Sequence, residues 1–130
     1  MEMSDLLSTM PFAETLGMSF VSATAEEVVA TLDWSEARTT LGGGLHGGAL
    51  MTFADSCGAV SAFLNLPAGA IGTSTIESKT NLFRAVRSGT VTATTTPLHA
   101  GRTTIAVQTE VRDDDGRLVS LTIQTQAVLA

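Results

Sequence analysis

The chain has 130 residues, which is enough for one domain with a buried core, so residues 1–130 are treated as a single domain. Seven Lys and Arg against thirteen Asp and Glu give a net charge of −6, which argues against a nucleic-acid surface because phosphate contacts need clustered basic side chains. The single Cys excludes an intramolecular disulfide and a structural zinc site built from thiolates.

The N-terminus lacks the basic patch and the long apolar stretch of a secretion signal. The longest mostly apolar stretch, residues 47–64, contains Asp55 and several Gly, Ser and Thr, which makes it too polar for a membrane span. We therefore expect a cytoplasmic protein without a membrane partner.

Two short helical segments are expected first. Leu6, Leu7 and Met10 recur at near-helical spacing until Pro11 interrupts them. A second short turn ends at Gly17, a residue that is typical of helix C-termini.

Residues 18–24 and 28–34 are typical of two strands joined as a hairpin. A glycine-rich turn at residues 41–48 follows. Residues 49–64 then favour a helix, because apolar side chains recur at steps of three and four. Asp55 is the only charge in this segment, so the helix is apolar almost all round and is expected to be buried. Its many small residues would let a sheet approach closely.

After the helix the pattern changes to four strands, at residues 71–83, 89–99, 105–111 and 119–127, with a hairpin turn at 113–116 before the last. Alternation places Ile105, Val107, Thr109 and Val111 on one face of the third strand, and Val119, Leu121, Ile123, Thr125 and Ala127 on one face of the fourth. We expect hairpin links without crossovers, and hence an antiparallel sheet. One long helix wrapped by such a sheet is an α+β design.

Gly47 and Gly48 follow His46 where the long helix begins. The N–H groups of a first helical turn have no intrahelical partner, glycine lets a ligand approach the backbone, and the helix dipole is positive there. These groups are therefore candidates for holding a developing oxyanion. A plain glycine-rich turn would look the same, and His46 could orient a carbonyl, cap the helix or simply pack.

Asp55 is the candidate catalytic carboxylate. Burying an isolated carboxylate is costly unless it is paired or functional. The alternatives are a buried ion pair and a hydrogen-bonded core Asp, since perturbed carboxylates occur outside active sites too. Cys57 on the same helix is interpreted as a buried, inert Cys, because no His lies near it in sequence.

The spacing of Gly47 and Asp55 has a consequence for assembly. Eight residues on one helix correspond to about 12 Å of axial rise. A carbonyl held about 3 Å from an oxyanion donor cannot also lie within reach of a carboxylate that distant. If both groups act on one substrate, they must come from different subunits, as the antiparallel helices of a two-fold dimer would arrange.

The segment Gly44-Leu-His-Gly-Gly-Ala-Leu-Met-Thr-Phe-Ala-Asp resembles the His-Gly-Gly…Asp signature of hotdog-fold thioesterases, in particular the PaaI-like (phenylacetate-degradation) family. The resemblance continues through residues 72–75, 81–85, 101–104 and 111–119, and covers nearly the whole chain in order. It implies six antiparallel strands wrapped around one central helix, in dimers that often pair into tetramers. It also implies hydrolysis of acyl-CoA thioesters without a metal or redox cofactor.

The resemblance assigns roles to individual residues. It implies that Asp55 attacks the thioester or activates a water, and that Gly47 offers an oxyanion N–H from the neighbouring chain. His46 matches the signature His. Ser74, or else Thr73, matches a Ser or Thr that orients the water or the carboxylate.

Other residues are candidates for substrate binding, including Gly48 of the glycine pair. Relatives commonly carry Asn or Gln where Thr40 stands, and a Thr hydroxyl has a shorter reach and one donor. The carbonyl is then held differently here, or the activity is weak. Arg84, Arg87 and Arg102 lie at strand ends or turns where they could face the CoA phosphates, although each could equally be a solvated surface Arg.

Two other functions fit the same residues. A hotdog hydratase or dehydratase acting on enoyl or hydroxyacyl thioesters would use His46 and Asp55 as its acid and base. A non-catalytic acyl-CoA binding module is compatible with Thr40 in place of the amide. The acyl group, aromatic or medium-chain, would meet an apolar pocket for which the candidates are Leu50, Met51, Phe53, Phe63, Leu64 and Phe83.

Overall fold

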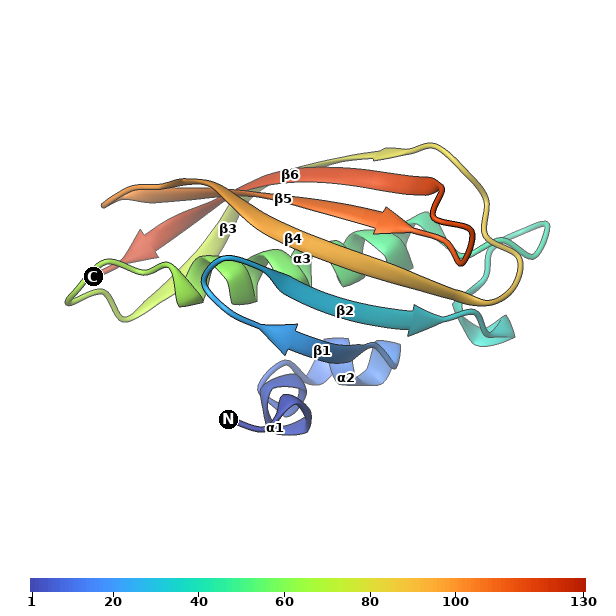
Figure 1. Ribbon diagram of the computed structural model, residues 1–130, viewed down its shortest axis with the longest axis horizontal. Coiled ribbons are helices and arrows are strands. Elements are labelled where there is room, and N and C mark those ends of the chain that lie inside the picture. Colours follow the sequence, from blue (N-terminus) through green and yellow to red (C-terminus); the bar gives the residue numbers. More distant parts are fainter.

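The computed structural model describes residues 1–130 as a six-stranded antiparallel sheet curved around one long helix (Figure 1). In chain order the elements are α1 (Met3–Ser8), α2 (Pro11–Leu16), β1 (Ser19–Ala23), β2 (Val28–Asp33), the 3-10 turn η1 (Glu36–Arg38), α3 (Gly47–Leu64), β3 (Gly72–Leu82), β4 (Thr90–Ala100), β5 (Thr104–Arg112) and β6 (Leu118–Leu129). The expected α+β class and the arrangement of a hotdog fold are confirmed.

The two short N-terminal helices follow their local signals. Pro11 is the first residue of α2, a position whose N–H has no partner within the helix, so the missing N–H of proline costs no hydrogen bond. Gly17 caps the same helix with a φ of 89°, a left-handed conformation that glycine adopts without strain. Contacts of α1 with β1 and of α2 with α3 hold this pair against the body of the domain (Figure 1).

The strand order is β1-β2-β4-β5-β6-β3, so β3 lies at an edge beside β6 and not next to β4. The expectation that only hairpins join the four strands after the helix is therefore wrong for this link. Residues 83–89 cross the end of the sheet past β6 and β5 (Figure 1). Three strand spacings amount to about 14 Å, and seven extended residues span up to about 24 Å, so the link is long enough.

Helix α3 packs against β2, β3, β4, β5 and β6, and Phe53, Ala54 and Cys57 on it are fully buried. By length and composition alone α3 is long and apolar enough to cross a membrane, so the expectation that this segment is too polar for a membrane span is wrong. In this fold the apolar side chains of α3 pack against the sheet, because α3 is the core element around which the strands curve. The expectation of a buried central helix is confirmed.

The face that β6 turns toward α3 is polar. Ser120, Thr122, Gln124 and Gln126 on this face are all buried, whereas Ile123 on the opposite face is 43% exposed. The apolar side chains that alternate along the strand from residue 121 therefore lie on the outer face of the sheet. On β5 the apolar face at Ile105, Val107, Thr109 and Val111 is the buried one.

Candidate active site

The Asp55 carboxylate is half-buried between α3 and the strands β3 and β6. Thr75 Oγ1 and Gln124 Nε2 each donate a hydrogen bond to Asp55 Oδ1, both at 2.9 Å. Gln126 Nε2 donates in turn to Thr75 Oγ1 at 2.6 Å. One carboxylate oxygen is thus held by two donors, while Oδ2 accepts no hydrogen bond from the protein and is free to meet a substrate or a water.

Asp55 takes part in none of the salt bridges of the chain, so the alternative of a buried ion pair does not apply. Hydrogen bonds alone hold the carboxylate, and donors to a charged oxygen are stronger than those between neutral groups. Gln124 is fully buried, and its Oε1 accepts no hydrogen bond. Burying an amide whose oxygen has no hydrogen-bond donor is costly, which indicates that the Gln124 side chain is oriented to donate to Asp55.

At the start of α3, the two glycine N–H groups differ. The Gly48 N–H donates to His46 Nδ1 at 2.8 Å, so His46 caps the helix. An accepting Nδ1 leaves the proton of the neutral ring on Nε2. The Gly47 N–H donates no hydrogen bond within the chain, and it is therefore the one available to an oxyanion.

Gly47 opens into a cavity of about 320 Å³ that Leu82, Phe83 and Arg84 also line. Asp55 does not line this cavity, since it lies two turns further along α3, or about 12 Å by helical rise. One chain therefore keeps its unpaired glycine N–H apart from its carboxylate.

Ser74 and Thr73 make no hydrogen bond to Asp55. Their neighbour Thr75 makes it instead. Alternation along β3 places residues 73 and 75 on the face toward α3 and Ser74 on the opposite face, where it is exposed. Thr73 instead lines an apolar cavity beside the site.

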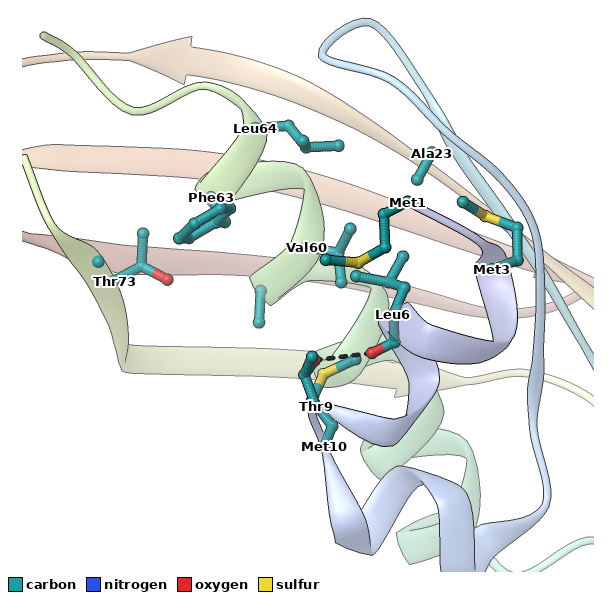
Figure 2. Close-up of a pocket in the computed structure, with 12 residues that line it drawn as sticks. Met1, Met3, Leu6, Thr9, Met10, Ala23, Val60, Phe63, Leu64 and Thr73 are labelled. Atoms are coloured by element: carbon teal, nitrogen blue, oxygen red, sulfur yellow. Dashed lines mark hydrogen bonds between the residues drawn. The ribbon is translucent and has the colours of Figure 1, made fainter.

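That apolar cavity measures about 600 Å³ and lies between α1, the second half of α3 and the first residues of β3 (Figure 2). Its near end is at Ala59, one helical turn after Asp55, and at Thr73. Phe63 and Leu64 are the two predicted pocket residues that line it, whereas Leu50, Met51, Phe53 and Phe83 do not.

Thr40 is exposed and immediately precedes the glycine-rich turn, and its N–H donates to the Gly44 carbonyl at 2.9 Å. Its hydroxyl makes no hydrogen bond within the chain. Arg87 Nε donates to the Gly42 carbonyl at 3.4 Å, so it contacts the same turn.

Arg84 and Arg102 are both exposed but lie at opposite ends of the sheet. Leu82, two residues before Arg84, pairs with Ser120 of β6. Thr104, two residues after Arg102, pairs with Ala127 of β6. Seven residues of strand separate those partners, which is about 23 Å. The two arginines of one chain therefore cannot contact the same phosphate group.

Cys57 is fully buried beneath the sheet. Burial raises the pKa of its thiol to about 12, against the smaller lowering effect of the neighbouring Thr95 hydroxyl. The thiolate needed for a nucleophile is thus disfavoured, in agreement with the interpretation of Cys57 as inert.

Three residues of the Asp55 network, Thr75, Gln124 and Gln126, were not predicted from the sequence. A signal for the two glutamines exists, because Gln, Ser and Thr alternate along residues 120–126 in a strand whose other face is mostly apolar. A second signal is Gly58, which lies within the helix three residues after Asp55 and faces Gln124.

Comparisons with known proteins identify the family of this chain. Residues 42–120, which include Gly47, Asp55 and Thr75, match the thioesterase superfamily. The esterase candidate ComA2 of Bacillus subtilis is 34% identical over 119 residues, which cover 89% of this chain and 92% of ComA2.

Solved structures agree over nearly the full length. A variant of thioesterase PA1618 from Pseudomonas aeruginosa superposes with a TM-score of 0.91 at 27% identity, covering 99% of this chain and 94% of that one. Thioesterase HI1161 from Haemophilus influenzae gives a TM-score of 0.91 at 25% identity, covering 99% and 91%. This chain therefore belongs to the thioesterase superfamily and has its hotdog fold.

Proposed function

We propose that this chain hydrolyses acyl-CoA thioesters to the free acid and CoA, in the cytoplasm, as a homo-oligomer built from two-fold dimers. The observation that carries the proposal is the Asp55 carboxylate, with one oxygen held by Thr75 and Gln124 and the other free. Thioester hydrolysis needs a nucleophile or an activated water and a donor for the oxyanion, and these are the groups that a thioesterase has to supply.

The chemistry divides between two subunits. In one route Asp55 Oδ2 takes a proton from a water as that water attacks the thioester carbonyl. In the other route Asp55 Oδ2 attacks the carbonyl itself, and the mixed anhydride that remains after the thiolate departs is hydrolysed by a water, which releases the acid and restores the carboxylate. The carbonyl oxygen gains negative charge and accepts a hydrogen bond from the Gly47 N–H of the neighbouring subunit. The carbon–sulfur bond then breaks with its electron pair on sulfur, and the thiolate departs and takes up a proton.

The open edge of β3 supports the dimer. No strand pairs with the outer edge of β3, and Ile76, Leu82 and Phe83 on or next to it are more than half exposed. An unpaired edge strand with exposed apolar side chains is a surface that folded proteins normally cover. Pairing of this edge with a second copy about a two-fold axis would bring the two α3 helices together, running antiparallel.

The Asp55→Asn variant tests the role of the carboxylate. We expect release of free thiol from acyl-CoA to fall about 10²-fold or more, as for loss of a general base. Binding of acyl-CoA and thermal stability should survive, because the amide keeps the size and much of the hydrogen bonding. A folded Asp55→Asn protein with near wild-type kcat on its best acyl-CoA would defeat the proposal. A tight acyl-CoA complex without thiol release by the wild type would favour the binding module.

The Gly47 N–H can be removed without removing the helix. Proline is well tolerated at the first helical position, and His46 before it has a ψ of 134°, which a following proline accepts. Gly47→Pro should lower kcat by about 10²-fold, as for loss of one oxyanion donor. Gly47→Ala is the matched control, because it adds a side chain against Leu82 Cδ1 but keeps the N–H. Equal losses in the two variants would argue for bulk and against an oxyanion donor.

Dimers that combine an Asp55→Asn chain with a Gly47→Pro chain test whether one site draws its groups from two subunits. Asp55→Asn and Gly47→Pro chains should each be nearly inactive alone. Half of the randomly mixed dimers contain one of each, and one of their two sites then has both groups intact, so about a quarter of wild-type activity should return. If each site drew both groups from a single chain, mixing would restore nothing.

A further inference from the structure

The wall of the cavity beside Asp55 is apolar over most of its surface. No charged side chain lines it, and Thr9 and Thr73 are the only residues with polar side chains on its wall. The Thr9 hydroxyl donates to the Leu6 carbonyl within α1 at 2.6 Å, so it is already satisfied (Figure 2). The Thr73 hydroxyl stands at the end nearest the carboxylate. An occupant should therefore be apolar along its length and polar only at that end.

Two elements, α3 and β3, each carry a residue that lines the cavity and a residue of the Asp55 site. On α3, Ala59 follows Asp55 by four residues, so both lie on one face of the helix. On β3, Thr73 precedes Thr75 by two residues and shares its face, and Thr75 donates to Asp55. A thioester carbonyl placed at Asp55 Oδ2 would thus have the cavity directly beside it.

The shape of the cavity distinguishes between acyl groups. It continues along α3 from Ala59 to Leu64, and Leu64 lies nine residues from Asp55, or about 13 Å of helical rise. The span from Asp55 to the far end of the cavity is longer than an aromatic ring and comparable to an extended octanoyl or decanoyl chain. The volume of about 600 Å³ is well within the range for drug-sized ligands.

The far wall is formed by Met3 and Leu6 of α1 and by Met10, which lies between α1 and α2 (Figure 2). Methionine is unbranched and flexible, and it adapts to apolar chains of different lengths. We propose that this cavity holds the acyl chain of the substrate, that α1 sets how long this chain can be, and that the preferred substrates carry linear aliphatic chains of medium length. The inference rests on the proposed acyl-CoA hydrolysis.

A chain-length series tests the inference. With wild-type protein, kcat/KM should rise by about fourfold per added methylene from butanoyl- to octanoyl-CoA, as expected for burial of each methylene. Benzoyl-CoA should be poorer than octanoyl-CoA. A flat series, or benzoyl-CoA as the best substrate, would overturn the inference.

Variants of α1 locate the effect. Leu6→Trp fills the cavity from its far wall and should lower kcat/KM for octanoyl-CoA at least tenfold, while butanoyl-CoA changes by less than about twofold. Met3→Trp fills the same cavity from another position on α1, and should act alike if Leu6→Trp does not fold. Ser4→Trp is the matched control, because Ser4 is exposed on α1 and does not line the cavity. Equal losses for both substrates would count against a chain-length role.

Binding separates this inference from the proposed function. The non-hydrolysable thioethers S-butyl-CoA and S-octyl-CoA are titrated into wild type and Leu6→Trp by calorimetry. Tighter binding of S-octyl-CoA that Leu6→Trp removes, without turnover of any acyl-CoA, would support the cavity and overturn hydrolysis. Turnover of acyl-CoA without any preference for S-octyl-CoA would overturn the cavity and leave hydrolysis standing.

Discussion

Gly58 of α3 and Gln124 of β6 are in direct contact, and a Cβ on Gly58 would lie 2.2 Å from Gln124 Oε1. The same amide donates from Nε2 to Asp55, three residues before Gly58 on the helix. The missing side chain at position 58 therefore makes the space through which Gln124 reaches the carboxylate. Helix packing and the candidate site depend on the same pair of residues.

Gly58→Ala should be destabilising, although Ala normally stabilises a helix interior by up to about 1 kcal/mol relative to Gly. The new methyl group cannot avoid the fully buried Gln124, and overpacking of this kind costs about 1–3 kcal/mol. Urea unfolding should show a loss of free energy together with a lower kcat. Adding Gln124→Ser should restore stability but not kcat. A Gly58→Ala protein that is more stable than wild type would contradict the contact.

Gln124→Leu should lower kcat by about tenfold or more, because the carboxylate loses a positioning donor and small misplacements are expensive. KM should stay unchanged, since Gln124 is buried behind Asp55. Stability should hold or rise, because the unpaired Oε1 is removed as well. Ser120→Ala is the control on the same strand, with a buried hydroxyl that has no partner. Equal kcat values for the two variants would show that Gln124 is structural only.

Arg102→Ala should raise KM for acyl-CoA more than it lowers kcat, because a phosphate contact binds the ground state and the transition state equally. Arg84→Ala should add its own effect, since the two side chains of one chain lie too far apart to share a phosphate. Steady-state kinetics at low salt measures both. An unchanged KM in Arg102→Ala would mark Arg102 as a solvated surface residue.

Cys57 should make the stability of the protein fall at high pH. Its thiol ionises near the ordinary value of 9.0 in the unfolded chain, whereas burial raises the pKa in the folded chain to about 12. A raised pKa contributes stability that is fully present below pH 9 and is lost between about pH 9 and 12, by about 4 kcal/mol in total. Urea unfolding of wild type and Cys57→Ala from pH 7 to 10.5 should show the extra decline in wild type alone. Parallel curves would contradict the assignment.

The sequence by itself determined the elements and the fold class. Helix and strand periods, Pro11, Gly17 and the turn at 113–116 act over a few residues, so local physics decides them. Asp55 was also identifiable, because a lone charge on an apolar helix is costly wherever that helix is buried. The unpaired Gly47 N–H follows from its place at the start of α3.

The tertiary structure alone decided which side chains meet Asp55. Alternation divides a strand into two faces, but it does not say which face is buried, and on β6 the polar face is the one that meets α3. The placement of β3 beside β6 is a non-local pairing, and it brings Thr75 and Gln126 together across 51 residues of chain. Strand order and register are set by packing between distant segments, so local patterns in the sequence do not contain them.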